Sequence, residues 1–272
     1  MVETGEWTIQ ELLKYLLTVR STLQPTEIEI LQLTPAFFEE SAVEKNRSED
    51  GTLKEVQRLK ASDLYEPLNV LRSLGLPVID WRGTDGELKW KHNSEEGTLY
   101  MVWPSCTLTL SPAKFLFKLG LRRYPTIDVV LGIAAGGGPQ GTAALDYFLD
   151  NYSRWYTDYT ANQHGSIAFV PAIHRGEKKL VKPLEVFSNL DWQSLGFPIL
   201  DPTLTRRQDA MNRLKIEEHP PTKDLVHLLE TSPPTTKDQA CEWFGVLSRR
   251  ILGLYDIVGQ VYMLIFTRLP SP

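Results

Sequence analysis

Apolar and polar residues follow one another along this 272-residue chain in two patterns, one typical of helices and one typical of short strands. In residues 142–156 the apolar side chains recur every three or four positions, which places them on one face of an amphipathic helix. The same spacing predicts further helices over 8–23, 113–119, 126–135, 207–214, 222–230 and 235–251. Thr142 and Thr235 stand where N-cap residues are expected.

Short apolar segments between these helices predict strands. Two of them are Val78–Ile79 and Ile199–Leu200. Two more are the apolar runs that end at Pro35-Ala36 and at Pro171-Ala172, where proline cannot continue a hydrogen-bonded ladder. Helices and short strands in this order predict a helix-rich α+β fold.

The whole pattern occurs twice. Residues 73–80 read SLGLPVID, and residues 194–201 read SLGFPILD. Four more pairs of segments match in the same order, namely 33–36 with 169–172, 67–70 with 183–186, 119–125 with 214–220, and 144–148 with 240–244. Self-similarity in a fixed order indicates an internal repeat. The sequence therefore predicts two tandem copies of one unit.

The matches divide the chain into a first α+β repeat over 1–156, a second over 157–251, and a tail over 252–272 of uncertain status. The first copy is longer, because an insert at about 84–112 has no counterpart in the second. Residues 97–114 are rich in β-branched side chains and almost free of charge. They are either a hairpin inserted into the unit or a translated intron, and in the second case the chain is a fragmentary or mis-spliced product.

Composition narrows the class of protein. The chain is 42% hydrophobic and 23% charged, which excludes a disordered or fibrous protein. The formal net charge is −5 and no run of Lys or Arg occurs, so we expect no nucleic-acid partner. The apolar tract 251–266 contains Asp256 and Gln260, and the N-terminus lacks a signal-peptide pattern. We expect no membrane span, no disulfide framework from Cys106 and Cys241, and a cytoplasmic or nuclear protein that is not secreted.

Gly136, Gly138 and Gly141 form a G-x-G-x-x-G pattern, which binds a pyrophosphate when it follows a strand and opens a helix. Here the preceding TIDVVLGIAA matches the helix-like TKDLVHLLE of the second copy. The acidic residue at the expected distance, Asp158, lies in a polar segment. We interpret the pattern as a loop between helices, with no cofactor. A nucleotide-binding enzyme that uses the Gly136–Gly141 loop is the alternative.

Other side chains that could carry chemistry are scattered. The five histidines are spaced unlike any standard zinc site, and we expect no metal; they are His92, His164, His174, His219 and His227. Asp80 and Asp201 are equivalent carboxylates of the two copies, which we expect to cap the turns after short strands. His219 matches Tyr124, which indicates a packing residue before a proline. We expect no catalytic residue.

Several segments resemble a region of very large fungal proteins of the sacsin-like type. They include LTPAF, LYEPLNVLRSLGLPVIDW, KFLFKLGLRRYPTIDVVLGIAA, PLEVFSNLDWQSLGFPILD and LKIEEHPPTKDLVHLLETSPP. In those proteins the region lies downstream of a GHKL-type ATPase domain, whose Asp-x-Gly-x-Gly loop and N-box this chain lacks. The resemblance implies a non-catalytic structural or interaction module of a chaperone-like ATPase assembly. Its partner would be a protein or the ATPase domain of the same larger protein; a truncated product without a stable fold is a third interpretation.

Overall fold

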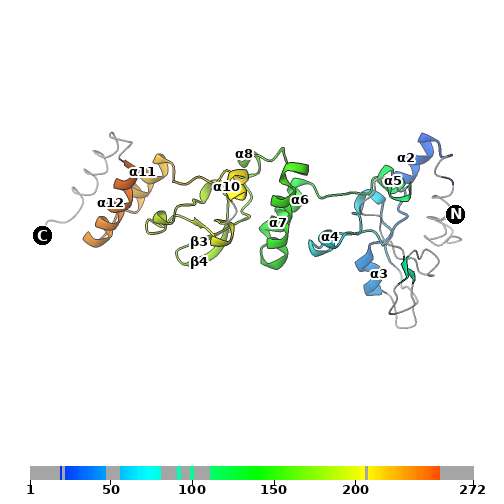
Figure 1. The fold of residues 1–272 in the computed structure, drawn as a ribbon, viewed down its shortest axis with the longest axis horizontal. Coiled ribbons are helices and arrows are strands. Elements are labelled where there is room, and N and C mark those ends of the chain that lie inside the picture. The colour runs from blue at the N-terminus through cyan, green and yellow to red at the C-terminus, as the bar shows by residue number, and fades with distance from the viewer. Residues whose placement is uncertain are drawn as a thin grey trace. The chain divides into compact units, whose positions relative to one another are not determined.

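The computed structural model describes residues 19, 22–46, 56–80, 91–92, 99–100, 111–205 and 208–251 (Figure 1). Helices dominate, with small antiparallel sheets between them, and this confirms the predicted helix-rich α+β fold. The chain divides into two compact units, Met1–Val129 (unit 1) and Val130–Pro272 (unit 2). The repeat boundaries at 1–156 and 157–251 stay predictions. The predicted helix 8–23 and the tail 252–272 lie outside the described residues, apart from Val19 and 22–23.

Unit 1 consists of short helices around a few bridged strand residues. Its elements are α2 (Pro25–Leu33), α3 (Glu40–Asn46), η1 (Ala61–Asp63), α4 (Asn69–Ser73), β1 (Lys91–His92), β2 (Leu99–Tyr100) and α5 (Ser111–Lys118). Helix α2 begins with Pro25 in its first turn, and the Glu27 carboxylate accepts the Gln24 amide at 2.7 Å. The strand predicted to end at Pro35-Ala36 is therefore wrong, because a capped helix occupies most of that apolar run. The β1–β2 pair lies within the predicted insert, most of which is outside the described residues.

Tyr65 is the centre of the backbone ladder in unit 1. Its N–H donates to the Pro77 carbonyl at 2.8 Å, and its carbonyl accepts the Ile79 N–H at 2.9 Å. The next amide, that of Glu66, donates to the Arg122 carbonyl at 2.9 Å. The predicted strand at 78–79 is thus present as bridges. The core beneath it consists of Ala36, Phe37, Ala61, Leu64, Ile79, Phe115, Leu116, Leu119 and Leu121.

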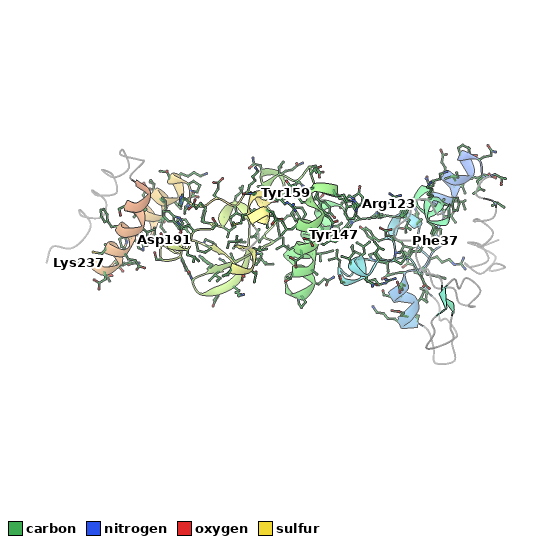
Figure 2. All side chains as sticks on the ribbon, viewed as in Figure 1. Phe37, Arg123, Tyr147, Tyr159, Asp191 and Lys237 are labelled. Atoms are coloured by element: carbon green, nitrogen blue, oxygen red, sulfur yellow. The ribbon has the colours of Figure 1, made fainter. Side chains whose placement is uncertain are left out.

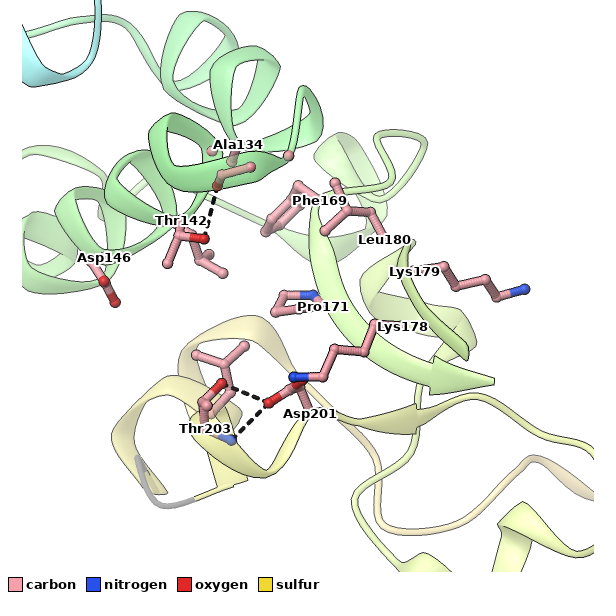
Figure 3. Close-up of a pocket in the computed structure, with 15 residues that line it drawn as sticks. Ala134, Thr142, Asp146, Phe169, Pro171, Lys178, Lys179, Leu180, Asp201 and Thr203 are labelled. Carbon is pink, nitrogen blue, oxygen red and sulfur yellow. Dashed lines mark hydrogen bonds and ion pairs between the residues drawn. The ribbon is translucent and has the colours of Figure 1, made fainter. Parts of the chain in front are cut away.

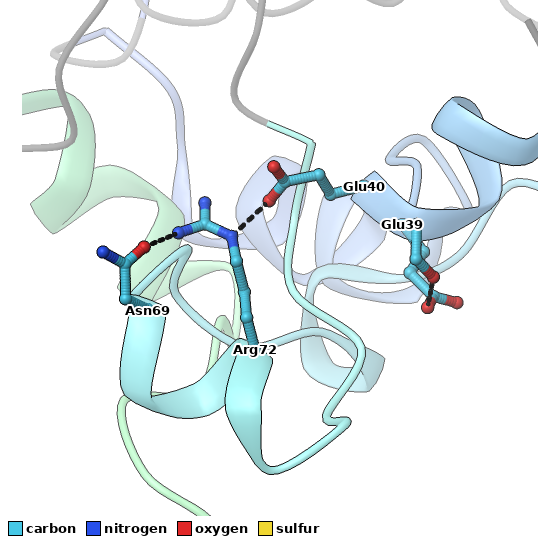
Figure 4. Close-up of polar contacts among 5 residues, drawn as sticks. Glu39, Glu40, Asn69 and Arg72 are labelled. Carbon is cyan, nitrogen blue, oxygen red and sulfur yellow. Dashed lines mark hydrogen bonds and ion pairs between the residues drawn. The ribbon is translucent and has the colours of Figure 1, made fainter.

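At the surface of unit 1, Arg72 of α4 joins two segments. Its Nε lies 2.8 Å from the Glu40 carboxylate, and its terminal nitrogen donates to the Asn69 side chain at 2.8 Å (Figure 4). The pair is partly open to solvent, because the Arg72 side chain is 37% exposed. It therefore connects α3 with α4 without being part of the core.

Unit 2 carries most of the regular structure, and α6 (Ile127–Ala135) begins just before it. It continues with α7 (Gly138–Trp155), α8 (Ala161–His164), β3 (Val170–His174), β4 (Glu177–Val181), η2 (Pro183–Glu185), η3 (Leu190–Gln193), β5 (Ile199–Leu200), α9 (Pro202–Thr205), α10 (Gln208–Leu214), α11 (Thr222–Thr231) and α12 (Lys237–Ile251). Each helix predicted between 126 and 251 is present. No helix of the described ranges has the length and apolar character to cross a membrane.

Both predicted N-caps are wrong. Thr142 lies inside α7, and its hydroxyl donates to the Gly138 carbonyl one turn earlier, at 3.0 Å. The helix begins before it because proline in the first turn needs no donated hydrogen bond. At α12 the hydroxyl that accepts a helix amide belongs to Thr236, which receives the Gln239 N–H at 3.2 Å. Thr235 instead donates its own N–H to the Gln239 side chain at 2.9 Å.

The sheet of unit 2 has the strand order β4-β3-β5, with both pairs antiparallel. The strand predicted to end at Pro171-Ala172 is β3, and this predicted end is wrong because β3 continues to His174. Pro171 lies opposite Leu180 of β4, and its carbonyl accepts the Asp201 N–H at 3.0 Å on the other side. The missing N–H of proline therefore affects only the β5 side of the strand, at its end.

Phe187 makes in unit 2 the same set of backbone hydrogen bonds that Tyr65 makes in unit 1. Its N–H donates to the Pro198 carbonyl at 3.1 Å and its carbonyl accepts the Leu200 N–H at 2.9 Å, while the following amide, that of Ser188, donates to the Glu217 carbonyl at 3.1 Å. The match of 67–70 with 183–186 is consequently wrong in register, since 67–70 follow Tyr65 whereas 183–186 precede Phe187. The match of 33–36 with 169–172 is also shifted, because Glu39 bridges Ile79 as Ala172 pairs with Leu200.

The interior of unit 2 has two parts. One is a group of aromatic rings around Phe148, which includes Tyr147 and Tyr159 (Figure 2). The other surrounds Trp192 and consists of Phe187, Leu195, Ile199, Leu225, Leu229, Ala240, Trp243, Val246 and Leu247. The amphipathic helices α11 and α12 supply most of the second group. This part therefore depends on the helical periodicity that the sequence shows.

Candidate functional site

A cavity of about 410 Å³ lies in unit 2 beside the N-terminus of α7, one face of the β3–β4 hairpin and the start of α9 (Figure 3). Its lining residues are Ala134, Gly137, Gly138, Gly141, Thr142, Leu145, Asp146, Phe169, Pro171, Lys178, Lys179, Leu180, Asp201, Thr203 and Leu204. A volume of this size is in the usual range of small-ligand and side-chain pockets. The three contributing segments are far apart in the sequence.

The predicted glycine loop forms one wall of this cavity. Gly137, the N-cap of α7, and Gly138, its first residue, have φ angles of 68° and 66°, a region that favours glycine. A Cβ atom on Gly141 would lie 2.9 Å from the Ala134 carbonyl oxygen, so only glycine permits this close approach of the helices. Gly136 is not among the lining residues. The segment before the loop is helix α6, so the strand that a Rossmann site requires is not in place.

Asp201 is the most buried carboxylate of the cavity, with 3% of its surface exposed. One carboxylate oxygen accepts the N–H and the hydroxyl of Thr203 at 2.9 and 2.8 Å, and the other lies 2.9 Å from Lys178 Nζ. Burial opposes ionisation of Asp201, but these contacts outweigh it and hold the pKa below its ordinary value. Asp201 thus caps the turn at the start of α9, as predicted. Asp80 donates its N–H to the Phe38 carbonyl at 2.8 Å, and the turn after it lies outside the described residues.

The histidines of the described segments have separate surroundings. His164 is buried and stacks on Tyr159 with ring centres 5.4 Å apart. The Nδ1 atom of His219 lies 3.1 Å from the Trp192 indole nitrogen, which donates to it, so His219 is a packing residue as predicted. The pKa of His174 is lowered by burial and by the nearby charge of Lys179. No group of three or more His, Cys, Asp or Glu able to hold a metal occurs in the described parts of the chain.

Cys241 is exposed on α12, and Cys106 lies outside the described residues. The sequence interpretation missed two side chains of the cavity, Lys178 and Thr203. For Lys178 the signal in the sequence is the run HRGEKKLVK, in which Arg-Gly separates two short segments as in a tight hairpin. A strand that ends at Pro171-Ala172, as the apolar pattern predicts, leaves no partner for this second segment.

The cavity is suited to holding a side chain or a small apolar group. Leu145, Phe169, Pro171, Leu180 and Leu204 supply apolar walls. The titratable residues among the lining are Asp146, Lys178, Lys179 and Asp201. The buried member of this set, Asp201, is neutralised by a lysine and held by backbone. Its contacts therefore position the strand and turn that form the wall.

Comparisons place the chain in a family by sequence. No curated protein and no solved structure matches it. A family model matches residues 1–257, which is nearly the whole chain. The chain therefore belongs to the family described as "Protein of unknown function (DUF3684)".

Proposed function

We propose that this chain is a non-catalytic interaction module that positions an ATPase domain or binds a protein client. The observation that carries the proposal is that polar side chains at the cavity bond to other groups of the chain itself. Asp201 accepts a hydrogen bond from Thr203 and forms an ion pair with Lys178. The Thr142 hydroxyl donates to a backbone carbonyl of its own helix. These contacts maintain the walls of a pocket with an apolar interior, which is the character of a recognition site.

The proposal also concerns the internal repeat of the chain. We infer that the chain is two copies of one α+β unit, because Tyr65 and Phe187 make the same set of backbone hydrogen bonds with residues in the same order. Two related units in tandem can present two related surfaces, as other repeat proteins do. The resemblance to the region downstream of a GHKL-type ATPase in fungal sacsin-like proteins supports a place in a chaperone-like assembly of the cytoplasm or nucleus.

ATP hydrolysis by the purified full chain tests the non-catalytic part of this proposal. The protein fractions from successive chromatography columns are tested in a coupled phosphate-release assay. We expect each fraction to release no more phosphate than buffer alone. Hydrolysis that follows the protein through each column would contradict the proposal. A Gly141→Val variant should then show whether the glycine loop is responsible, because its side chain would collide with the Ala134 carbonyl.

Client binding is tested separately by light scattering of heat-unfolded citrate synthase. We expect the full chain to suppress aggregation in proportion to its concentration, and to do so equally with and without ATP. Albumin at the same concentration is the control. Aggregation that proceeds as in the albumin sample would contradict client binding and leave only the positioning of an ATPase domain.

A further inference from the structure

Strand β4 forms one edge of its sheet, because the strand order is β4-β3-β5. Arg175 and Gly176 both have positive φ angles, 53° and 82°, as in the two-residue turn that closes a hairpin on a hydrogen-bonded pair. That pair is His174 with Glu177, and hydrogen-bonded pairs alternate with non-hydrogen-bonded pairs along an antiparallel ladder. The second and fourth residues of β4 therefore direct their backbone groups away from β3.

These two residues are Lys178 and Leu180, and the other side of the hairpin agrees with the assignment. Leu180 lies opposite Pro171, which has no N–H and whose carbonyl accepts the Asp201 N–H on the side of β5. Pro171 and Leu180 are thus a non-hydrogen-bonded pair. No strand of the described residues lies along the outer side of β4. Its edge offers two N–H and two C=O groups with the spacing of a strand.

The hairpin that carries this edge is positively charged. Its charged residues and those just after it are Arg175, Glu177, Lys178, Lys179 and Lys182. Lys178 is paired with Asp201, and Lys182 with Glu185 at 3.0 Å. Lys179 borders the cavity, but its exposed side chain extends away from it (Figure 3). The edge therefore attracts acidic groups, and opposition of like charges disfavours a second copy of the same hairpin.

The cavity opens on one face of this edge. Lys178 and Leu180 share that face, since alternate residues of a strand lie on the same side, and both line the cavity. A strand added beside β4 would place every second side chain next to them. Its other side chains would lie beside Lys179 on the opposite face. Backbone pairing supplies affinity in this mode of recognition, and the pocket supplies specificity.

We propose that the edge of β4 binds an extended segment of a partner protein in which acidic and apolar residues alternate. The segment pairs with the outward N–H and C=O groups of Lys178 and Leu180. One apolar side chain enters the 410 Å³ cavity, and an acidic side chain lies beside Lys179. This inference rests on the proposed function as an interaction module and names the chemistry of the partner.

Fluorescence anisotropy with the full chain and a fluorescein-labelled peptide of alternating Glu and Leu tests the proposal. Leu180→Pro removes an outward N–H without affecting the β3–β4 ladder, and we expect binding to weaken about tenfold. Lys179→Glu reverses the exposed charge and should weaken binding about two- to fivefold. Lys223→Glu, the same change at an exposed position of α11, is the matched control and should leave the affinity unchanged.

Near-UV circular dichroism shows whether the proline variant is folded, and if it is not, the comparison of Lys179→Glu with Lys223→Glu decides. The inference is overturned when the wild-type chain does not bind the peptide. It is equally overturned when a peptide of alternating Lys and Leu binds as well, or when both edge variants bind like the wild type. None of these results affects the hydrolysis and aggregation measurements, so the proposed function is judged independently.

Discussion

Units 1 and 2 have the same central hydrogen bonds but differ in the strand that precedes them. In unit 1 that strand is reduced to bridges, in which Phe37 pairs with Leu59 and Glu39 with Ile79. In unit 2 it is a continuous hairpin of five residue pairs, closed by a two-residue turn. The shared part is the segment from Tyr65 or Phe187 to the following Asp, and the edge that we propose for partner binding lies where the units differ. Four experiments test this comparison.

The largest effects are expected at a core position that the two units share. Leu71 and Trp192 are almost fully buried, and each carbonyl accepts the amide five residues later at 3.2 Å. Leu71→Ala should lower the free energy of unfolding by about 2–5 kcal/mol and Trp192→Ala by about 3–5 kcal/mol, because each leaves a cavity. Urea denaturation followed by circular dichroism measures both. The exposed Val70→Ala is the control, and a loss there as large as that of Leu71→Ala would contradict burial as the cause.

A smaller effect is expected at the residue with a positive φ angle that follows α5 and α10. Gly120 has a φ of 101° and Lys215 a φ of 58°, so the same position is glycine in unit 1 and a side-chain residue in unit 2. Gly120→Ala should cost about 1–3 kcal/mol, also because its Cβ would lie 3.3 Å from Ser62. Lys215→Gly should stabilise by up to about 1 kcal/mol. Opposite signs in thermal unfolding support equivalence, and equal signs would refute it.

Asp201 distinguishes unit 2 as a buried carboxylate that pairs with an exposed lysine, and its contribution to stability should depend on pH. Because its pKa is lowered in the folded state, its stabilisation is complete above the ordinary pKa of aspartate and disappears as pH falls through the folded pKa. Asp201→Asn should therefore cost about 1–3 kcal/mol at neutral pH and close to nothing at about pH 2. Asp209→Asn, at an exposed position, should show little effect. A pH-independent cost at position 201 would contradict this account.

The smallest effect is expected at the exposed pair of unit 1. Glu40→Gln removes the partner of Arg72, and we expect a loss below about 1 kcal/mol because solvent screens the pair. In about 0.5 M salt the difference from the wild type should decrease further. Denaturation at the two salt concentrations measures it. A loss equal to that of Asp201→Asn would contradict this, since it would mean that the two ion pairs contribute equally to the free energy of unfolding.

The sequence predicts the helices well and the first strands poorly, for physical reasons. Residues 126–135 and 222–230 have strong apolar periodicity, and both are helical. For the runs before Pro35 and Pro171 the sequence predicts strands that end at the proline, and both predictions are wrong. In one, a capped helix begins at Pro25, and in the other the proline lies where its missing N–H costs a single hydrogen bond.

The cavity could not be predicted, because its walls come from three segments whose packing no local pattern reveals. The glycine pattern at 136–141 does reach it, although through helix packing and not through a strand. The position of Asp201 after a short strand predicts a turn cap, and the structure confirms it. Its lysine partner lies on β4, which β3 separates from β5, and sequence spacing carries no information about that pairing.

The hydrogen bond from Trp192 to His219 provides a spectroscopic marker of unit 2. The indole N–H is donated to Nδ1 at 3.1 Å, so the imidazole carries its proton on Nε2, on the side of Glu218. Such a buried indole proton gives its own resonance in a nitrogen–proton correlation spectrum and exchanges slowly with solvent. A single peak can therefore report whether this unit is intact, even while unit 1 or a bound partner changes.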